Sequence, residues 1–487
     1  MNFVEAIRKE DNFTTTTNGA IALKSTESSL VDLFGTIGAL RNADVQEIET
    51  KFIKAFAEDK LLAMKMLFYA RDIRGGLGER RVFRVIIKYL ATMHKFDIKK
   101  NLKYISEFGR WDDLFVLLDT ELKQDVINLI HDQLQSDLCS EYPSLLAKWL
   151  KSENTSSKES VRIARTIREG LKLSPREYRK ILSQLRAKIN IVEANMSSGR
   201  WTEIEYAKVP SRAMMIYRKA FEYHDPKGFE DFIDLLQNGE TKINASTLYP
   251  YDLLEKMSSS SFGFGLHYIK QDKIIEEQWK ALPNYVDGEN NILIMADTSG
   301  SMLGRPMATS VGLAIYFAER NKGIFKDVFM TFSSEPSFVT LKGNTLYEKL
   351  RCVPEIVSNT NLEAAFDLIL KAALNNNLAS SDMPKSLVVI SDMQFDEAQT
   401  GYGDRMTFYD TMVSKYANAG YEMPNVIFWN VNSSKDTFQV TSSYKGVQLA
   451  SGQSPSVFKS ILANIGKTPY EAMESALNVE RYSVITV

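Results

Sequence analysis

A carboxylate and two hydroxyls follow an unbroken apolar run in the second half of this 487-residue chain. The run is Ile292 to Met295, and Asp297, Ser299 and Ser301 come after it at every second position. An apolar run without a polar break is typical of a strand buried on both faces of a parallel sheet. Open α/β sheets bind their ligands at the carboxyl ends of such strands. Because all three side chains offer only oxygen, the stretch predicts a site for a hard cation such as Mg²⁺.

Two later positions extend this pattern. Thr360 lies in the segment NTNLEAAF, before a helix-like stretch, and Asp392 ends a second apolar run, SLVVISD. The Asp-x-Ser-x-Ser spacing, with these two partners in this order, resembles the metal-ion-dependent adhesion site of von Willebrand factor type A domains. The resemblance implies that five side chains hold the cation, directly or through water: Asp297, Ser299, Ser301, Thr360 and Asp392.

Two positions, each next to one of the expected ligands, depart from the family pattern. Met393 and Asn359 stand where the family often has glycine, and both could alter the geometry of their loops. Neither departure changes a ligand. The plainer alternative is an ordinary strand–loop–helix corner, in which the Asp and Ser side chains only cap the following helix.

The resemblance implies Mg²⁺ as the cofactor, with Mn²⁺ or Ca²⁺ as alternatives, and an open coordination position for a carboxylate from a protein partner. An enzyme is the less favoured interpretation. Phosphatases that form an aspartyl-phosphate need a second acid two residues after the nucleophile, where this chain has Ser299. The four histidines are scattered, without a pair at metal-ligand spacing. We therefore expect a protein that is not an enzyme, and a Mg²⁺-dependent phosphohydrolase remains the minor alternative.

The elements that must position these residues alternate between strands and helices after Pro283. We predict a von Willebrand A type doubly wound sheet over residues 286–487, because such alternation gives a mostly parallel sheet with helices on both faces. Further strands are expected at residues 327–333, 337–341, 386–391 and 425–431. The segment 438–451 is expected to form a hairpin that turns at Lys445-Gly446.

Residues 1–285 have a different, helical texture. Apolar residues recur at helical spacing, as at Leu30, Leu33 and Ile37, and we predict an α-helical repeat domain, HEAT-like, forming an arc or a ring. The segment TTTTNG at 14–19 reads as a loop. The segment RDIRGGLGERR at 71–81 allows two interpretations: an arginine-lined turn that touches phosphates, or a helix–helix turn held by ion pairs, which we favour.

Basic residues concentrate in one part of the helical half. Residues 1–285 carry 43 Lys and Arg against 40 Asp and Glu, whereas residues 158–219 alone carry 15 against 6. Such a region can attract polyanions, although most charge runs are solvated helix faces. The residues predicted to contact RNA phosphates are Arg162, Arg165, Arg168, Arg176, Arg179, Lys180 and Arg186.

The chain as a whole resembles an uncharacterised family found in viruses and eukaryotes, through LVDLFGTIGALR, FYARDIRGGLGERRVFRVIIKYL, LSPREYRKILSQLR and VPSRAMMIYRKAF. It is also similar, more loosely, to the Ro autoantigen, whose TROVE domain is a ring of helical repeats closed by a von Willebrand A domain. This resemblance implies binding of small structured or single-stranded RNA in a ribonucleoprotein. A metal-dependent protein scaffold that binds no RNA is the alternative.

The cysteine count and the first residues indicate the cellular compartment in which we expect the protein. The two cysteines, Cys139 and Cys352, are too few for a disulfide framework and fit a reducing compartment. The first residues, MNFVEAIRKEDN, carry charges where a signal peptide needs an apolar core. We therefore expect a cytoplasmic protein without a membrane partner. The sequence does not indicate an oligomeric state.

Overall fold

The computed structural model describes residues 11–258, 265–286, 291–332, 336–354, 361–396, 407–433 and 435–487. Contacts divide the chain into two compact units. The sheet unit comprises Met1–Ala63 and Leu248–Val479, and the helical unit comprises Met64–Thr247 and Glu480–Val487. Both units are therefore discontinuous in sequence. The segment 248–285 groups with the sheet, so the contacts do not divide the chain at the predicted boundary between 285 and 286.

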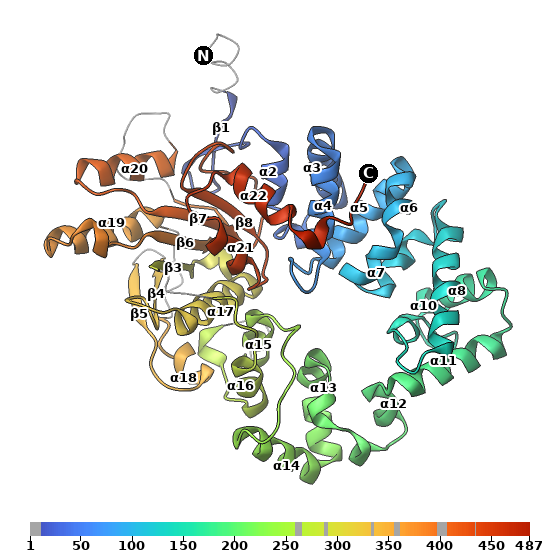
Figure 1. Cartoon of the computed structure of the whole chain (residues 1–487). Helices are drawn as coiled ribbons and strands as arrows, with labels where there is room; N and C mark the ends of the chain where they lie inside the picture. The colour runs from blue at the N-terminus through green and yellow to red at the C-terminus, as the bar shows by residue number, and fades with distance from the viewer. Residues whose placement is uncertain are drawn as a thin grey trace. The chain divides into compact units, whose positions relative to one another are not determined.

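A six-stranded sheet forms the centre of the sheet unit (Figure 1). Its strand order is β5-β4-β3-β6-β7-β8, and all neighbouring pairs are parallel except β4 and β5. The strands are β3 Ile292–Asp297, β4 Val328–Phe332, β5 Ser337–Thr340, β6 Ser386–Ser391, β7 Asn425–Asn430 and β8 Val447–Ser451. Strands β3 and β6 are buried along their whole length, as their apolar runs predict.

Helices cover both faces of this sheet. They are α17 Arg305–Arg320, α18 Leu346–Leu350, α19 Leu362–Asn375, α20 Phe408–Asn418, α21 Val457–Ala463 and α22 Pro469–Leu477. Phe428 and Trp429 are neighbours on β7, so their side chains point to opposite faces. Trp429 packs against Phe458 of α21, whereas Phe428 packs against Tyr409 of α20. The predicted doubly wound sheet following a helical half is therefore confirmed.

The segments that join the sheet unit from outside the predicted domain are mostly helical. They are β1 Phe13–Thr15, β2 Ile21–Leu23, α2 Ser29–Phe34, α3 Val45–Glu58, α15 Pro250–Met257 and α16 Lys273–Lys280. The predicted hairpin over 438–451 is wrong. Strand β8 pairs in parallel with β7, and Phe438 instead forms a bridge with Leu23. The segment at Phe438 therefore pairs with β2, from the N-terminal region, and not with residues 447–451.

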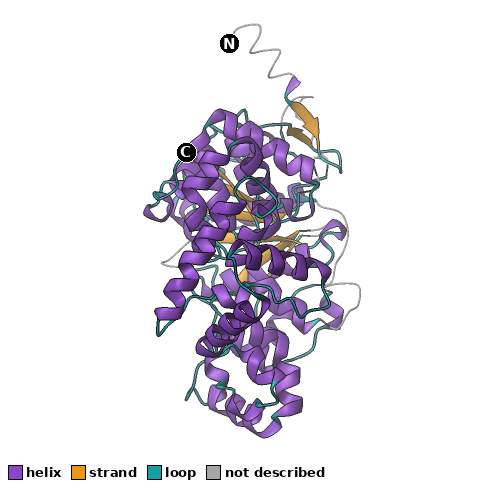
Figure 2. Cartoon of the chain, turned by 90° about the vertical axis from the view of Figure 1, so that its right-hand side faces the viewer, coloured by secondary structure: helices purple, strands orange, loops and turns teal. Residues whose placement is uncertain are grey.

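The helical unit is built from short helices, and helices make up most of the chain (Figure 2). Helix α4, Lys60–Arg71, enters it from the sheet unit. The other helices are α5 Arg80–Met93, α6 Lys95–Asn101, α7 Ile105–Phe108, α8 Lys123–Cys139, α9 Leu146–Trp149, α10 Lys158–Gly170, α11 Pro175–Ile189, α12 Val192–Ser197, α13 Ser211–His224 and α14 Pro226–Gln237. Helix α11 begins with the capping box that its sequence predicts, since Ser174 and Glu177 each accept the backbone N–H of the other.

The turn at residues 71–81 is held by buried ion pairs. Arg71, only 2% exposed, donates through Nε to Asp113 Oδ2 at 2.8 Å. Arg84 donates through Nε to Asp113 Oδ1 at 2.7 Å. Asp72 accepts from Nη2 of Arg481 at 2.8 Å, which ties residues 480–487 to this unit. These contacts support the structural interpretation of the arginine-rich turn over the phosphate-binding one.

Among the described residues, none of the helices combines the length and the apolar composition that crossing a membrane requires.

Candidate metal centre

The two predicted metal-site carboxylates lie at the ends of adjacent parallel strands. In the register of β3 and β6, Ala296 pairs with Ile390, which brings Asp297 beside Ser391 and Asp392 at the carboxyl edge. Asp297 Oδ2 accepts a hydrogen bond from the Ser391 hydroxyl at 2.5 Å. Asp297 is fully buried and Asp392 is 2% exposed. The two carboxylates therefore lie at the same edge of the sheet, and their role as metal ligands stays a prediction.

The two serines of the first loop line the same place. The backbone N–H of Ser299 donates to Asp297 Oδ1 at 2.9 Å, which folds the loop back onto the strand end. The hydroxyls of Ser299 and Ser301 lie 3.2 Å apart. The Ser301 side chain also favours the charged form of Asp392 by lowering its pKa, so the hydroxyl of the loop after β3 acts on the carboxylate of the loop after β6. Ser299 is buried, whereas Ser301 is exposed, and the arrangement therefore opens toward solvent on the Ser301 side.

The electrostatics of the site favour a cation. Burial, and then the negative charge of Asp392, raise the pKa of Asp297 to about 7 despite hydrogen bonds from Ser299 and Ser391. Burial also raises the pKa of Asp392, against the hydrogen bond from Ser301. Two neighbouring carboxylates out of contact with water are costly unless a positive charge compensates them. A hard divalent ion suits a donor set made only of carboxylate and hydroxyl oxygens, so the residues fit the group that the resemblance implies.

Met393 keeps the loop geometry that a glycine would give. Its φ is +64°, in the left-handed region that glycine adopts easily and other residues avoid. The side chain of Met393 is 5% exposed, and its backbone N–H donates to the Ser391 hydroxyl at 3.1 Å. The residue at this position therefore differs from the family pattern, but its backbone adopts the conformation that a glycine would favour.

One predicted ligand is not placed, and one participant was not predicted. Thr360 lies outside the described residues, so its role stays a prediction. Ser391 was not singled out, although it directly precedes Asp392 in SLVVISD; the one signal for it is that a polar residue ends an otherwise apolar buried run. Within the described parts of the chain, no group of three or more His, Cys, Asp or Glu is arranged to hold a metal. The candidate site therefore depends on hydroxyls as well as carboxylates.

The seven predicted RNA-contacting cations fall into two groups. Three make contacts outside their own helix: Arg162 pairs with Asp119, as well as with Glu159 of its own helix, and Arg168 pairs with Glu153 at 2.9 Å. Arg186 donates to the carbonyl oxygens of Ala147 and Leu150 at 2.9 and 2.7 Å, as a structural residue does.

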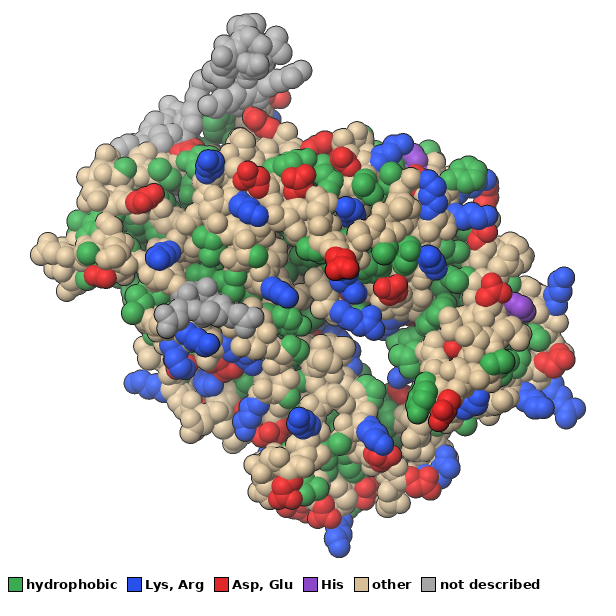
Figure 3. Space-filling model, viewed as in Figure 1, with side chains coloured by type: hydrophobic (Ala, Val, Ile, Leu, Met, Phe, Trp, Pro, Cys, Tyr) green, Lys and Arg blue, Asp and Glu red, His purple; other side chains and the backbone are tan. Residues whose placement is uncertain are grey.

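The other four cations are exposed on α10 and α11: Arg165, Arg176, Arg179 and Lys180. On the face shown in Figure 3, basic and acidic side chains are interspersed. The phosphate contacts therefore stay a prediction, and the structure makes these four residues better placed for them than the other three.

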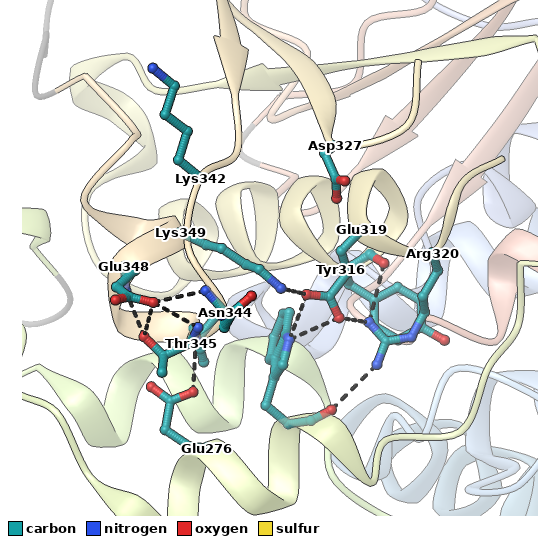
Figure 4. A network of polar contacts seen from close by, with 12 residues as sticks. Glu276, Tyr316, Glu319, Arg320, Asp327, Lys342, Asn344, Thr345, Glu348 and Lys349 are labelled. Carbon is teal, nitrogen blue, oxygen red and sulfur yellow. Dashed lines mark hydrogen bonds and ion pairs between the residues drawn. The ribbon is translucent and has the colours of Figure 1, made fainter. Parts of the chain in front are cut away.

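A second polar cluster in the sheet unit lies beside a cavity of about 370 Å³. Glu319 accepts from Trp279 Nε1 at 3.0 Å and from Lys349 Nζ at 2.7 Å (Figure 4). Glu276 accepts the backbone N–H groups of Leu346 and Tyr347 at 2.6 and 3.0 Å, and so caps α18. The hydrogen bonds and ion pairs of these two carboxylates join α16, α17 and α18, so the cluster stabilises the fold.

Comparison with known proteins gives three findings. Residues 16–159 and 131–289 match the family described as a domain of unknown function, DUF2828, and residues 291–482 match another, DUF7788. "Uncharacterized protein L728" of Acanthamoeba polyphaga mimivirus is 30% identical over 497 residues, which cover 93% of this chain and 85% of that protein. The crystal structure of the Deinococcus radiodurans RO (RSR) protein matches 90% of this chain and 99% of that chain at 12% identity, with a TM-score of 0.40.

Proposed function

The chain belongs to the DUF2828 family, and we propose that it is a non-enzymatic binding protein that captures a partner's carboxylate through a divalent cation. The cation would lie at the carboxyl edge of the sheet, where the loops after β3 and β6 meet. The resemblance to von Willebrand A domains supports this proposal from the sequence side. Ser299 stands where a phosphatase would need a second acid, and we therefore propose binding without hydrolysis.

One observation carries the proposal: Asp297 and Asp392 are buried next to each other at the ends of adjacent strands. A pair of carboxylates in such a place destabilises the fold unless it is protonated or compensated. A bound cation is the compensation that also gives the pair a function. Asp297, Ser299, Ser301 and Asp392 would hold the ion, with Thr360 added by the resemblance.

The surroundings of the site suit a protein ligand. Leu303, two residues after Ser301, is 60% exposed and offers an apolar surface beside the site. Arg305 follows it at the start of α17, where it pairs with Glu255 at 2.8 Å and lies over the ring of Tyr251. A partner that places an acidic side chain on the metal would thus meet an apolar contact at Leu303 and a cation at Arg305.

The first experiment measures Mn²⁺ binding by the decrease of the free-ion EPR signal, for the wild type and for Asp297→Ala. Asp382→Ala is the matched control, because Asp382 is an exposed acid of the same unit. We expect the wild type and the control to bind one ion, and Asp297→Ala to lose it. Binding by Asp297→Ala at wild-type affinity would refute the proposed site.

The second experiment tests the ligand class. An array of immobilised peptides that differ only by Asp or Asn at the central position is probed with the purified protein, with Mg²⁺ or with EDTA. We expect Mg²⁺-dependent retention on Asp peptides only. Equal retention on both peptide sets, or retention that EDTA leaves unchanged, would refute capture through a metal-bound carboxylate.

RNA binding by the helical unit is the second candidate function. The observation that favours it is the set of exposed cations on α10 and α11: Arg165, Arg176, Arg179 and Lys180. Phosphate contacts dominate the affinity of nucleic-acid binding and make it fall steeply with salt. The similarity to Ro proteins found in the sequence suggests small structured or single-stranded RNA as the ligand.

The test replaces these cations with alanine together: Arg165, Arg176, Arg179 and Lys180. A control removes the same charge elsewhere on the helical unit, at the exposed residues Lys103, Lys123, Lys227 and Lys242. We expect the wild type to bind a single-stranded RNA probe at ~50 mM salt with a steep salt dependence, and the first variant alone to lose most of that dependence. Equal binding by both variants would refute the assignment of this surface.

A further inference from the structure

The segment TTTTNG, which the sequence marks only as a loop, lies against the second loop of the candidate metal centre. Its first two residues, Thr14 and Thr15, belong to β1, and the others connect β1 to β2, two short strands that pair as an antiparallel hairpin. Gly19 forms a bridge with Asp396, four residues after the metal-site Asp392. Both segments belong to the sheet unit, although more than 370 positions separate them in the sequence. We call residues 16–19 the strap.

The strap holds the backbone and side chain of Gln394 through several hydrogen bonds. The backbone N–H and the hydroxyl of Thr17 both donate to Gln394 Oε1, at 2.9 and 2.7 Å. Asn18 Nδ2 donates to the carbonyl oxygen of Gln394 at 2.8 Å. The Thr16 hydroxyl donates to the carbonyl oxygen of Phe395 at 2.5 Å. Thr16 and Gln394 are both 3% exposed, so the bond from Thr16 is protected from competition by water, whereas Thr17 and Asn18 reach the buried Gln394 from the surface.

Gln394 in turn contacts the metal-site carboxylate. Its backbone N–H donates to Asp392 Oδ1 at 3.2 Å, and its Nε2 donates to the carbonyl oxygen of Asp392 at 3.4 Å. Between the two residues lies Met393, whose positive φ is a conformation that a methionine adopts only when its surroundings impose it. The hydrogen bonds on both sides of Met393, to Ser391 and to the strap, are what fix this turn.

We propose that the strap and Gln394 are positioning elements of the metal centre. Thr17 and Asn18 fix Gln394, Gln394 orients Asp392, and Asp392 is thereby aimed at Asp297 for joint binding of one cation. This inference rests on the proposed function of the metal site. It adds that the N-terminal hairpin, which contributes no ligand, sets the metal affinity.

The test compares three variants of the strap with the wild type. Thr17→Val combined with Asn18→Ala removes two of the side-chain hydrogen bonds to Gln394. Thr17→Ser retains the hydroxyl and is the conservative rescue. Asn12→Ala is the matched control, because the side chain of Asn12 bonds to the backbone of Ser25 at the far end of the same hairpin, at 2.9 and 3.0 Å, away from the metal loop. Mn²⁺ affinity is measured by EPR, and thermal unfolding is recorded for each protein.

We expect the double variant to bind Mn²⁺ about tenfold or more weakly, as loss of residues that orient metal ligands commonly does. Thr17→Ser and Asn12→Ala should bind as the wild type does. A readout that needs no metal is hydrogen exchange in peptides covering 388–396, which should become faster in the double variant and stay unchanged in Asn12→Ala.

The outcomes separate the two hypotheses. If the wild type binds Mn²⁺ and the folded double variant binds it equally tightly, the strap has no positioning role and this inference is wrong, while the proposed metal site stands. If the wild type binds no Mn²⁺, the metal site itself is refuted, and the inference with it. If Asn12→Ala weakens Mn²⁺ binding as much as the double variant does, the effect comes from the hairpin as a whole, and the specific role of Thr17 and Asn18 is refuted.

Discussion

Replacing Asp297 with asparagine separates the electrostatic cost of the metal site from its packing, because the two side chains have nearly the same shape. The asparagine oxygen can accept the N–H of Ser299, and its amide can donate to the hydroxyl of Ser391, which in the wild type donates to the carboxylate. The neighbouring charge of Asp392 remains. The substitution thus removes one of two buried negative charges and leaves the hydrogen-bonding positions filled.

The expected effect follows from the pKa of Asp297. Burial and Asp392 raise this pKa from 3.8 to about 7 in the folded protein. The folded state therefore holds a proton that the unfolded state releases, and the stability of the metal-free protein falls as pH rises from about 4 to about 7. With 1.36 kcal/mol per pKa unit, the cost at pH 8 is on the order of 4 kcal/mol. Asp297→Asn should recover most of this free energy at pH 8 and almost none at pH 4.

The assay is hydrogen exchange in EDTA, followed in peptides that cover β3 and β6, because it reports the stability of the sheet unit alone. Adding Mg²⁺ at about 100 times its dissociation constant should stabilise the wild type by about 2.7 kcal/mol and leave Asp297→Asn unchanged. The reasoning is refuted if metal-free wild type is as stable at pH 8 as at pH 5, or if the asparagine variant is no more stable than the wild type at pH 8.

Three further substitutions give distinct results. Ser391→Ala removes the hydroxyl that links the two loops of the site, and we expect Mn²⁺ affinity to fall about tenfold with little change in melting temperature; an unchanged affinity by EPR would contradict this. Arg71→Met leaves the buried Asp113 with the cation of Arg84 and the backbone N–H of Arg110. The helical unit should then lose about 3 kcal/mol in urea denaturation, and a loss below ~1 kcal/mol would argue against a buried network. Trp279→Phe removes one donor to Glu319, while Lys349 still pairs with that carboxylate. The free energy of unfolding of the sheet unit should fall by about 1 kcal/mol, and hydrogen exchange in α17 measures this change.

Much of the sheet and of its site follows from local sequence signals. The apolar runs before Asp297 and Asp392 specify buried parallel strands, and the carboxyl ends of neighbouring parallel strands meet at one edge. The convergence of these carboxylates could therefore be predicted without coordinates. Ser391 was missed because the pattern of the family names ligands, and a residue that orients a ligand leaves no spacing signal of its own.

The parts that could not be predicted depend on contacts between segments far apart in sequence. Phe438 has the alternation of a hairpin arm, but its partner is Leu23, and local pattern does not show which strand a segment pairs with. The same holds for Thr17 and Gln394, whose pairing makes a threonine-rich loop part of the metal centre. For the basic helices, spacing identified exposed faces but did not show that Arg162 has two acidic neighbours.

The return of residues 480–487 to the helical unit has a consequence for synthesis of the protein. Tyr482 stacks against Phe108 and meets Tyr69 edge-on, with ring centroids at 5.6 and 5.9 Å, so it completes a core formed by the first helices. The ribosome adds these residues only after the whole of 248–479. The helices that form this core must therefore wait, with part of their apolar surface uncovered, until residues 480–487 have been made, and a nascent chain of this kind depends on chaperones for longer than one whose domains close in order.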